Sequence, residues 1–267
     1  MGFIERLKQV AETSESLICV GLDTDTEKLP ASLFATGDVL TFNKKIIDAT
    51  FDLVCAYKPN SAFYEALGSR GMDILEETCR AVPSHIPIIL DVKRGDIGNT
   101  AKKYATAAYD RIGADAVTVN PYMGFDAVKP FLCEGKCVFV LCLTSNPSAN
   151  DFQTFDTGDG LLFERVARAA VGWANYGEVG LVVGATRPEY LSRVRDIAPD
   201  LPLLIPGIGA QGGDIEQVIS GVGYLPGLTI INSSREILYA SNGENYAEAA
   251  RMNLLNLRSA INQFREC

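Results

Sequence analysis

The sequence is poor in the residues that build metal centres. It has one histidine, His85, in a segment that we expect to be a loop with an ordinary surface role. Its seven cysteines include one close pair, Cys133 and Cys137, but no second pair with the spacing of a zinc site. Most of the others lie in apolar runs, where a free thiol behaves as a small hydrophobic side chain. We therefore expect no bound metal, and the odd number of cysteines suits a reducing compartment.

Positive charge and long apolar runs are also scarce. Lys and Arg total 24 against 33 Asp and Glu, which gives a net charge of -9. Nonspecific binding to nucleic acid or to an anionic membrane would have to overcome this repulsion, so neither is expected as a partner. No run approaches the roughly 18 apolar residues of a membrane span. Residues 1–14 read as an amphipathic helix rather than a signal peptide, and we expect a cytoplasmic protein.

Eight short runs rich in aliphatic and β-branched residues alternate with segments of helical spacing. The runs are 17–23, 55–63, 87–93, 115–122, 137–145, 180–186, 201–209 and 228–235. Helical spacing appears in 39–54, 72–82, 100–113, 161–177 and in a long segment from Tyr246. This alternation predicts a single (β/α)8 barrel domain over 1–267, with 1–14 as an extra N-terminal helix. An open, doubly wound sheet is the alternative, but no G-x-G-x-x-G fingerprint follows the first run.

The third run ends in a dense set of charges, because residues 88–97 read IILDVKRGDI. Alternate residues of a strand share a face, so Asp91 and Lys93 should project together and Arg94 away from them. Lys58 lies in the neighbouring second run, where we expect its strand to end, and Asp96 follows the third run on the loop. Two lysines and two carboxylates would form one cluster that keeps both lysines protonated and ready to meet developing negative charge. A structural ion network at the barrel rim is the alternative.

A phosphate site is predicted after the last two strands. Residues 206–214 read PGIGAQGGD, and Gly212 stands just before a helix that Asp214 begins. Backbone N–H groups at a helix N-terminus bind anions. Arg235, after strand eight, could bind the same anion through its forked guanidinium group. These two loops are where barrels of this kind most often bind phosphate. The alternative is that the glycines serve only as turn and cap residues.

The combination of these segments resembles the orotidine 5′-monophosphate decarboxylase family. The pattern D-x-K-x-x-D at Asp91, Lys93 and Asp96, followed by I-G-N-T up to Thr100, is similar to the signature of that family. The resemblance continues in the segments at 20–23, 57–65, 118–124, 143–147, 182–186, 206–214 and 233–235. Related barrel enzymes that act on sugar phosphates share D-x-K-x-x-D, so the whole set of segments carries the likeness.

The resemblance implies a carboxy-lyase that converts orotidine 5′-monophosphate to uridine 5′-monophosphate in pyrimidine synthesis, with no metal or organic cofactor. Lys93 would face C6 and donate the replacing proton, and Asp91 would lie near the departing carboxylate. The remaining substrate contacts would come from Lys58 and Asp23 to the ribose, Ser145 to the pyrimidine, Gln211 between pyrimidine and phosphate, and Gly212 and Arg235 at the phosphate. Asp96, Ile97 and Thr100 would enter the site of a neighbouring subunit, which implies a homodimer with shared active sites.

Two rival functions remain open at this point. A metal-dependent sugar-phosphate lyase or decarboxylase of the same superfamily would, by resemblance, carry a carboxylate where this chain has Lys58. A catalytically silent nucleotide-binding protein is the second rival, and the intact Lys93 cluster argues against it. The loop 146–160 is either a mobile lid or a surface connection, and we favour a role near the pocket because it follows Ser145.

Overall fold

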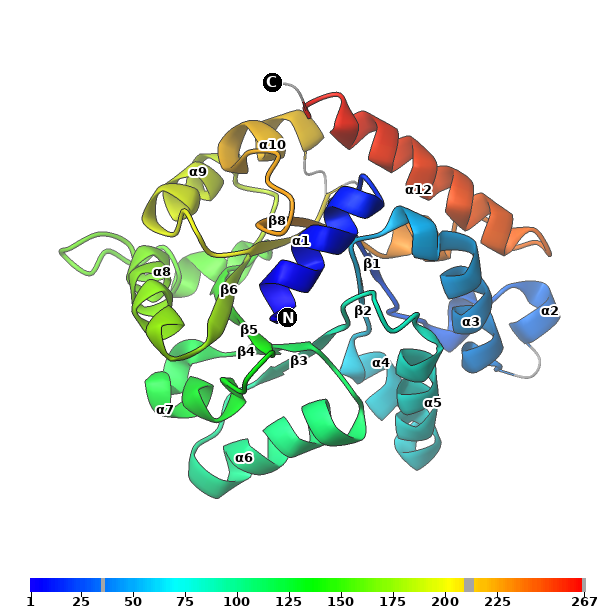
Figure 1. Ribbon diagram of the computed structural model, residues 1–267, viewed down its shortest axis with the longest axis horizontal. Helices are drawn as coiled ribbons and strands as arrows, with labels where there is room; N and C mark the ends of the chain where they lie inside the picture. The colour runs from blue at the N-terminus through cyan, green and yellow to red at the C-terminus, as the bar shows by residue number, and fades with distance from the viewer. Residues whose placement is uncertain (35–36, 209–213, 266–267) are drawn as a thin grey trace.

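A computed structural model describes residues 1–34, 37–208 and 214–265. This part of the chain contains eight parallel strands, β1 (Ile18–Gly21), β2 (Ala56–Lys58), β3 (Ile89–Arg94), β4 (Ala116–Val119), β5 (Cys137–Leu143), β6 (Glu178–Val183), β7 (Leu203–Pro206) and β8 (Thr229–Ser233). Hydrogen bonding runs in the order β2-β1-β8-β7-β6-β5-β4-β3. The remaining seam closes through hydrogen bonds from Tyr57 N to Pro87 O at 3.0 Å and from Asp91 N to Pro59 O at 2.9 Å. The predicted barrel is confirmed, and Figure 1 shows its strands inside a ring of helices.

The helices in the described residues are α1 (Phe3–Thr13), α2 (Ala31–Phe34), α3 (Val39–Thr50), α4 (Ser61–Glu65), α5 (Gly68–Ala81), α6 (Gly98–Thr106), α7 (Phe125–Val128), α8 (Leu162–Trp173), α9 (Pro188–Ile197), α10 (Ile215–Val222), α11 (Arg235–Leu238) and α12 (Tyr246–Asn262). Side-chain caps define several of their starts. Asp38 accepts the Thr41 N–H at 2.9 Å before α3, and Asp214 accepts the Glu216 N–H at 2.8 Å before α10. Within the described ranges, none of these helices is both long and apolar enough to cross a bilayer.

Several strands are shorter than their apolar runs. In the run 55–63 the strand β2 ends at Lys58, because Asn60 accepts the Ala62 N–H at 3.1 Å and starts α4. The run 228–235 ends as a strand at Ser233, since Arg235 begins α11. The run 201–209 ends at Pro206, and residue 209 lies outside the described residues. Turn and cap chemistry at the carboxyl ends therefore overrides the apolar pattern there.

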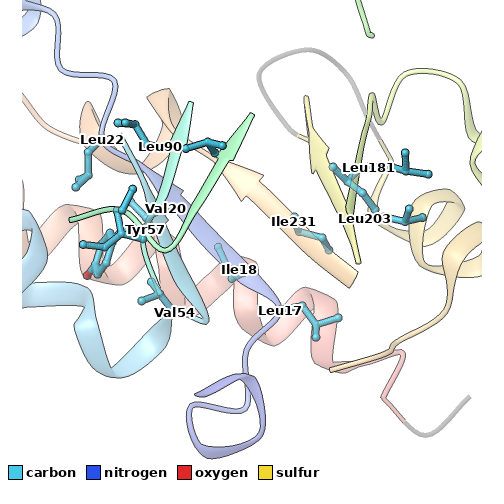
Figure 2. Close-up of a cluster of buried hydrophobic side chains, with 14 of the residues drawn as sticks. Leu17, Ile18, Val20, Leu22, Val54, Tyr57, Leu90, Leu181, Leu203 and Ile231 are labelled. Carbon is cyan, nitrogen blue, oxygen red and sulfur yellow. The ribbon is translucent and has the colours of Figure 1, made fainter. Parts of the chain in front are cut away.

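The main apolar core lies between the strands and the surrounding helices. Strand residues that point outward are fully buried, for example Val20, Leu90 and Ile231, each 0% exposed. Figure 2 shows these side chains with Leu17, Ile18, Leu22, Val54, Tyr57, Leu181 and Leu203 from the same cluster. Both faces of a parallel strand are covered in this way, which explains why the strands read as continuous apolar runs.

Helix α1 closes the amino-terminal end of the barrel. Its buried residues Phe3, Leu7 and Ala11 belong to the cluster that fills the barrel interior, and Phe3 meets Phe139 edge-on with ring centroids 5.8 Å apart. Glu178 of β6 accepts the Phe3 and Ile4 N–H groups at 2.7 and 3.2 Å, which satisfies the free donors at the helix start. Figure 1 shows α1 lying across the middle of the ring. The extra N-terminal helix is thus confirmed, and the opposite end is left for a site.

Candidate active site

A cavity of about 630 Å³ opens at the carboxyl ends of the strands. Its lining divides into two halves by strand. Strands β1 to β4 and the residues that follow them contribute Asp23, Lys58, Asp91, Lys93 and Thr118, and β8 with the residues after it adds Asn232, Ser233, Ser234, Arg235 and Glu236. Strands β5 to β7 contribute Leu141, Val182, Leu204 and Pro206. A ligand with one charged and one apolar side would match this division, and the carboxyl end is where barrels of this fold hold their active sites.

Four charged side chains meet in the polar half. Lys58 Nζ lies 3.5 Å from Asp23 Oδ1 and 3.3 Å from Asp91 Oδ2. Lys93 Nζ donates to the other Asp91 oxygen, Oδ1, at 2.6 Å. The signs alternate along this row, which we call the charge array, so each charge has an opposite neighbour. The Lys58 side chain is 5% exposed and that of Lys93 is 48% exposed, which leaves Lys93 open to a ligand.

Lys58 and Asp91 hold their charges over a wide pH range. Burial alone would lower the pKa of Lys58, but the Asp23 and Asp91 carboxylates outweigh it and raise that pKa above its ordinary value. Burial also opposes ionisation of Asp91, yet Lys58 and Lys93 together bring the pKa of Asp91 down to about 2. The buried part of the array is therefore a fixed pattern of charge, suited to electrostatic stabilisation rather than to amine nucleophilic chemistry.

The end of β3 is not a regular strand. Between the pairs Leu90↔Val117 and Arg94↔Val119 the register shifts, because β3 advances by four residues while β4 advances by two. Lys93 has φ +44°, a left-handed conformation that non-glycine residues rarely adopt. Asp91 and Lys93 face the same cavity as a simple alternation predicts, but an irregular backbone brings them there.

Arg94 points away from the cavity. Its guanidinium lies 2.8 Å from Glu65 Oε1 and 4.7 Å from the centre of the Tyr104 ring. These contacts tie β3 to α4 and α6, so Arg94 has the structural role that its opposite orientation predicted.

Asp96 is not the second carboxylate of the array within one chain; Asp23 takes that place. Asp96 Oδ1 accepts the Ile97 N–H at 2.8 Å at the start of α6, and no described ion pair joins Asp96 to Lys58 or Lys93. The sequence expectation of one cluster containing Asp96 is wrong for the single chain, because the loop turns that carboxylate toward its own helix. Ile97 is 50% exposed, and Thr100 is exposed on the same helix.

Ser145 lies in the cavity wall just after β5. Gly184 after β6 lets it approach closely, since a Cβ on Gly184 would come within 2.8 Å of Ser145 N. Ser145 O also accepts from Thr186 Oγ1 at 3.5 Å. The two loops are thereby packed together, which fixes the Ser145 backbone beside the apolar half.

The predicted phosphate end lies partly in the described residues. Pro206, Gly207 and Ile208 line the cavity after β7, and Gly207 has φ +100°, which favours glycine. Arg235, the first residue of α11, lines the same side and is exposed. Gln211 and Gly212 lie outside the described residues.

The loop 146–160 borders a second cavity of about 610 Å³ instead of the first one. Phe152 and Gln153 line that second cavity with α8, and Leu141 forms part of both walls. Gln153 Oε1 accepts the Thr144 N–H at 2.7 Å, so the loop is fastened to the residue beside Ser145. Its described residues contribute nothing to the lining of the main cavity, and the expectation of a role at the pocket is not met in this structure.

Three further residues of the site were not singled out from the sequence. Thr118 lies inside the apolar run of β4, yet its hydroxyl donates to Asp91 Oδ1 at 2.8 Å. Ser234 donates to Asp23 Oδ2 at 2.8 Å and accepts from Asn232 Nδ2 at 3.4 Å. Asn232 Oδ1 is buried with no hydrogen-bond partner among the described residues. Polar residues at inward positions near a strand's carboxyl end are the signal that would find them.

A barrel with this cavity and charge array is a small-molecule enzyme of the (β/α)8 class. Within the described residues, no group of three or more His, Cys, Asp or Glu side chains is arranged to hold a metal ion. The model of the orotidine 5′-phosphate decarboxylase / HUMPS family matches residues 16–250. The chain therefore belongs to this family.

Full-length relatives and solved structures agree with this assignment. An orotidine 5′-phosphate decarboxylase of Dechloromonas aromatica is 50% identical over 277 residues, covering 99% of this chain and 100% of the relative. That of Herpetosiphon aurantiacus is 49% identical over 254 residues, covering 93% of this chain and 94% of the relative. The structure of Leishmania donovani OMP decarboxylase has a TM-score of 0.87 at 40% identity and covers all of both chains.

Proposed function

We propose that this protein removes carbon dioxide from orotidine 5′-phosphate to give uridine 5′-phosphate, the last step of pyrimidine nucleotide synthesis. It is then a carboxy-lyase that uses neither metal nor organic cofactor, in the cytoplasm. The observation that carries the proposal is the charge array of Asp23, Lys58, Asp91 and Lys93 above a cavity, in a chain whose full-length relatives bear this activity in their names.

The reaction breaks the bond between C6 of the pyrimidine and its carboxylate carbon. The electron pair stays on C6, in an sp² orbital that the ring π system cannot delocalise. Lys93 would face C6, stabilise this pair and transfer a proton from Nζ to it, after which the lysine regains a proton from solvent. Asp91 would lie beside the departing carboxylate and hold Lys93 in place through their 2.6 Å contact.

The size of the barrier shows that Lys93 does not act alone. Enzymes lower barriers by about 8 to 23 kcal/mol, and a carbanion without resonance places the demand near the upper end. One ammonium at about 3.5 Å from the charge contributes on the order of 5 kcal/mol at an effective dielectric of about 20. The remainder is expected from the preorganised array and from phosphate binding energy realised in the transition state.

Substrate recognition would distribute over both halves of the cavity. Asp23 and Lys58 would contact ribose hydroxyls, because both line the polar half beside the reacting centre. Ser145 would hydrogen-bond the pyrimidine from the apolar side. The phosphate end would comprise Arg235 with Gln211 and Gly212.

The active form would be a homodimer with shared sites. Asp96, Ile97 and Thr100 would enter the partner's cavity and complete it, which is supported by the position of Asp96 outside its own array and by the exposure of Ile97. The mixing of inactive Asp96→Ala and Lys93→Ala chains tests this arrangement. One site of each mixed dimer regains intact residues, so random exchange should restore activity in about a quarter of all sites. Proven subunit exchange without recovered activity would contradict a shared site.

The first test is the near-ultraviolet absorbance of orotidine 5′-phosphate mixed with purified protein, with and without chelator. We expect a spectral change to that of uridine 5′-phosphate at a rate that chelator does not alter. A folded sample that leaves the spectrum unchanged would overturn the proposed function. A rate abolished by chelator and restored by a divalent ion would favour a metal-dependent lyase of the same superfamily.

A further inference from the structure

The Thr118 hydroxyl occupies the junction between the two reacting side chains and the backbone that carries them. Its Oγ1 accepts the Val92 N–H at 3.0 Å and the Lys93 N–H at 2.9 Å. It donates to Asp91 Oδ1 at 2.8 Å. A hydroxyl has one proton and two lone pairs, so these three bonds use all of its capacity and fix the direction of each. The residue is 1% exposed and lines the main cavity.

The backbone of β3 needs this hydroxyl because the strand is irregular there. The register shift between Leu90 and Arg94 leaves the N–H groups of Val92 and Lys93 out of step with the carbonyls of β4. Buried backbone donors require a partner, and the Thr118 side chain supplies one oxygen to both. The left-handed conformation of Lys93, with φ +44°, persists only where surrounding contacts hold it.

The same hydroxyl also sets the Asp91 carboxylate. Asp91 Oδ1 receives Lys93 Nζ at 2.6 Å and Thr118 Oγ1 at 2.8 Å, while Oδ2 faces Lys58 Nζ at 3.3 Å. With Thr118 in place, the carboxylate is held against rotation about its last bond. The orientation of Lys93 Nζ is therefore determined twice by Thr118, once through its own backbone and once through Asp91.

We propose that Thr118 is a positioning residue. Its single hydroxyl fixes both the left-handed backbone of Lys93 and the plane of the Asp91 carboxylate. This inference rests on the proposed function for its catalytic consequence, but its geometric content stands without it. Shape alone does not explain a threonine here, since valine fills the same volume and the neighbouring cavity floor is apolar at Leu141 and Val182.

The test compares Thr118→Val, which removes the hydroxyl, with Thr118→Ser, which keeps it. Loss of hydrogen bonds to a charged group and to two backbone donors should lower the kcat of Thr118→Val by about 10- to 100-fold. The KM and the affinity for uridine 5′-phosphate should change far less, because the Thr118 hydroxyl contacts Asp91 and the backbone of Val92 and Lys93 rather than the ribose or phosphate. Thr118→Ser should retain kcat close to that of the unaltered protein.

Thr229→Val is the matched control. Thr229 is equally buried at 1% and donates to Gly223 O at 2.9 Å, but it lies at the start of β8 and outside the cavity lining. It should lose stability without losing kcat. A Thr118→Val enzyme with unchanged kcat, or a Thr118→Ser enzyme as impaired as Thr118→Val, would overturn the proposal.

Crystal structures of the two Thr118 variants supply a readout independent of turnover. Lys93 should leave the left-handed region in Thr118→Val and keep it in Thr118→Ser. An unchanged Lys93 backbone in Thr118→Val would overturn the positioning role. If the unaltered protein and Thr229→Val both fail to convert orotidine 5′-phosphate, the proposed function fails, while these structures still decide the role of Thr118.

Discussion

The two ends of the barrel use charge and apolar surface in opposite ways. At the amino end, Phe3 and Leu7 of α1 fill the interior, and the partly buried charged residues Arg6 and Lys136 both pair with Asp115. At the carboxyl end, charges line the interior itself, and the apolar strand residues Leu141, Val182 and Leu204 line one side of the cavity. The same eight strands thus connect a stabilising end with a reactive one.

Because of this difference, the residues that bury charge at the site are not the residues that contribute most of the apolar stabilisation at the amino end. Burial of the Lys58 and Asp91 charges requires each to have a partner, and the alternating order of the array provides one. The apolar closure at the far end contributes hydrophobic stabilisation that involves no group of the site. Substitutions at the two ends should therefore affect different measurements.

Lys93→Ala should produce the largest effect at the carboxyl end. In the proposed mechanism this substitution removes both the electrostatic partner of the carbanion and its proton donor, so it should lower kcat by at least about 10⁴-fold. The affinity for uridine 5′-phosphate should remain measurable by calorimetry. Lys136→Ala removes a lysine from the amino end and should leave kcat unchanged. Substantial turnover in Lys93→Ala would remove the proton-donor role.

Phe3→Ala, at the amino end, should lower stability and leave kcat unchanged. Deletion of a fully buried aromatic ring from the barrel plug should lower the free energy of unfolding by about 3 to 5 kcal/mol, measured by urea denaturation. The kcat of the folded fraction should stay at the unaltered value, because Phe3 lies at the opposite end from the cavity. A matching fall in kcat at temperatures where the variant is folded would show that the two ends are coupled.

The stability of the protein in acid should reveal the charge array at the carboxyl end, with a smaller effect than either substitution above. The pKa of Asp91 is held at about 2, below its ordinary value of 3.8, so its ionisation stabilises the fold above the ordinary pKa and this contribution is lost as pH falls toward 2. The difference corresponds to about 2 kcal/mol. Urea unfolding at pH 6 and pH 2.5 should show most of this loss in the unaltered protein and less of it in Asp91→Asn. Equal losses in both would contradict the pairing.

Much of the architecture was predictable because strands buried on both faces leave a strong apolar pattern. The charges at Lys58, Asp91 and Lys93 stood out since they interrupt that pattern at strand ends. Strand ends were less predictable: the run 55–63 contains Asn60, whose cap bond starts a helix that periodicity does not reveal. The short helices α2, α4, α7 and α11 were also not anticipated.

The finer geometry of the site depends on contacts between distant segments. Asp23 joins Lys58 across two strands, a pairing that spacing along the chain does not specify. Thr118 reads as one more strand residue until the register shift of β3 is known. The left-handed backbone of Lys93 has no local sequence signal, because lysine has no preference for that conformation.

Closure by α1 also has a kinetic consequence for the proposed reaction. Because Phe3, Leu7 and Ala11 fill the amino end, the described residues place the opening of the main cavity at the carboxyl rim. In the proposed reaction, substrate and product pass through the same opening. The product must therefore leave before the next substrate binds. The product is consequently expected to act as a competitive inhibitor. The reaction rate should fall as product accumulates, because bound product blocks the entry of substrate.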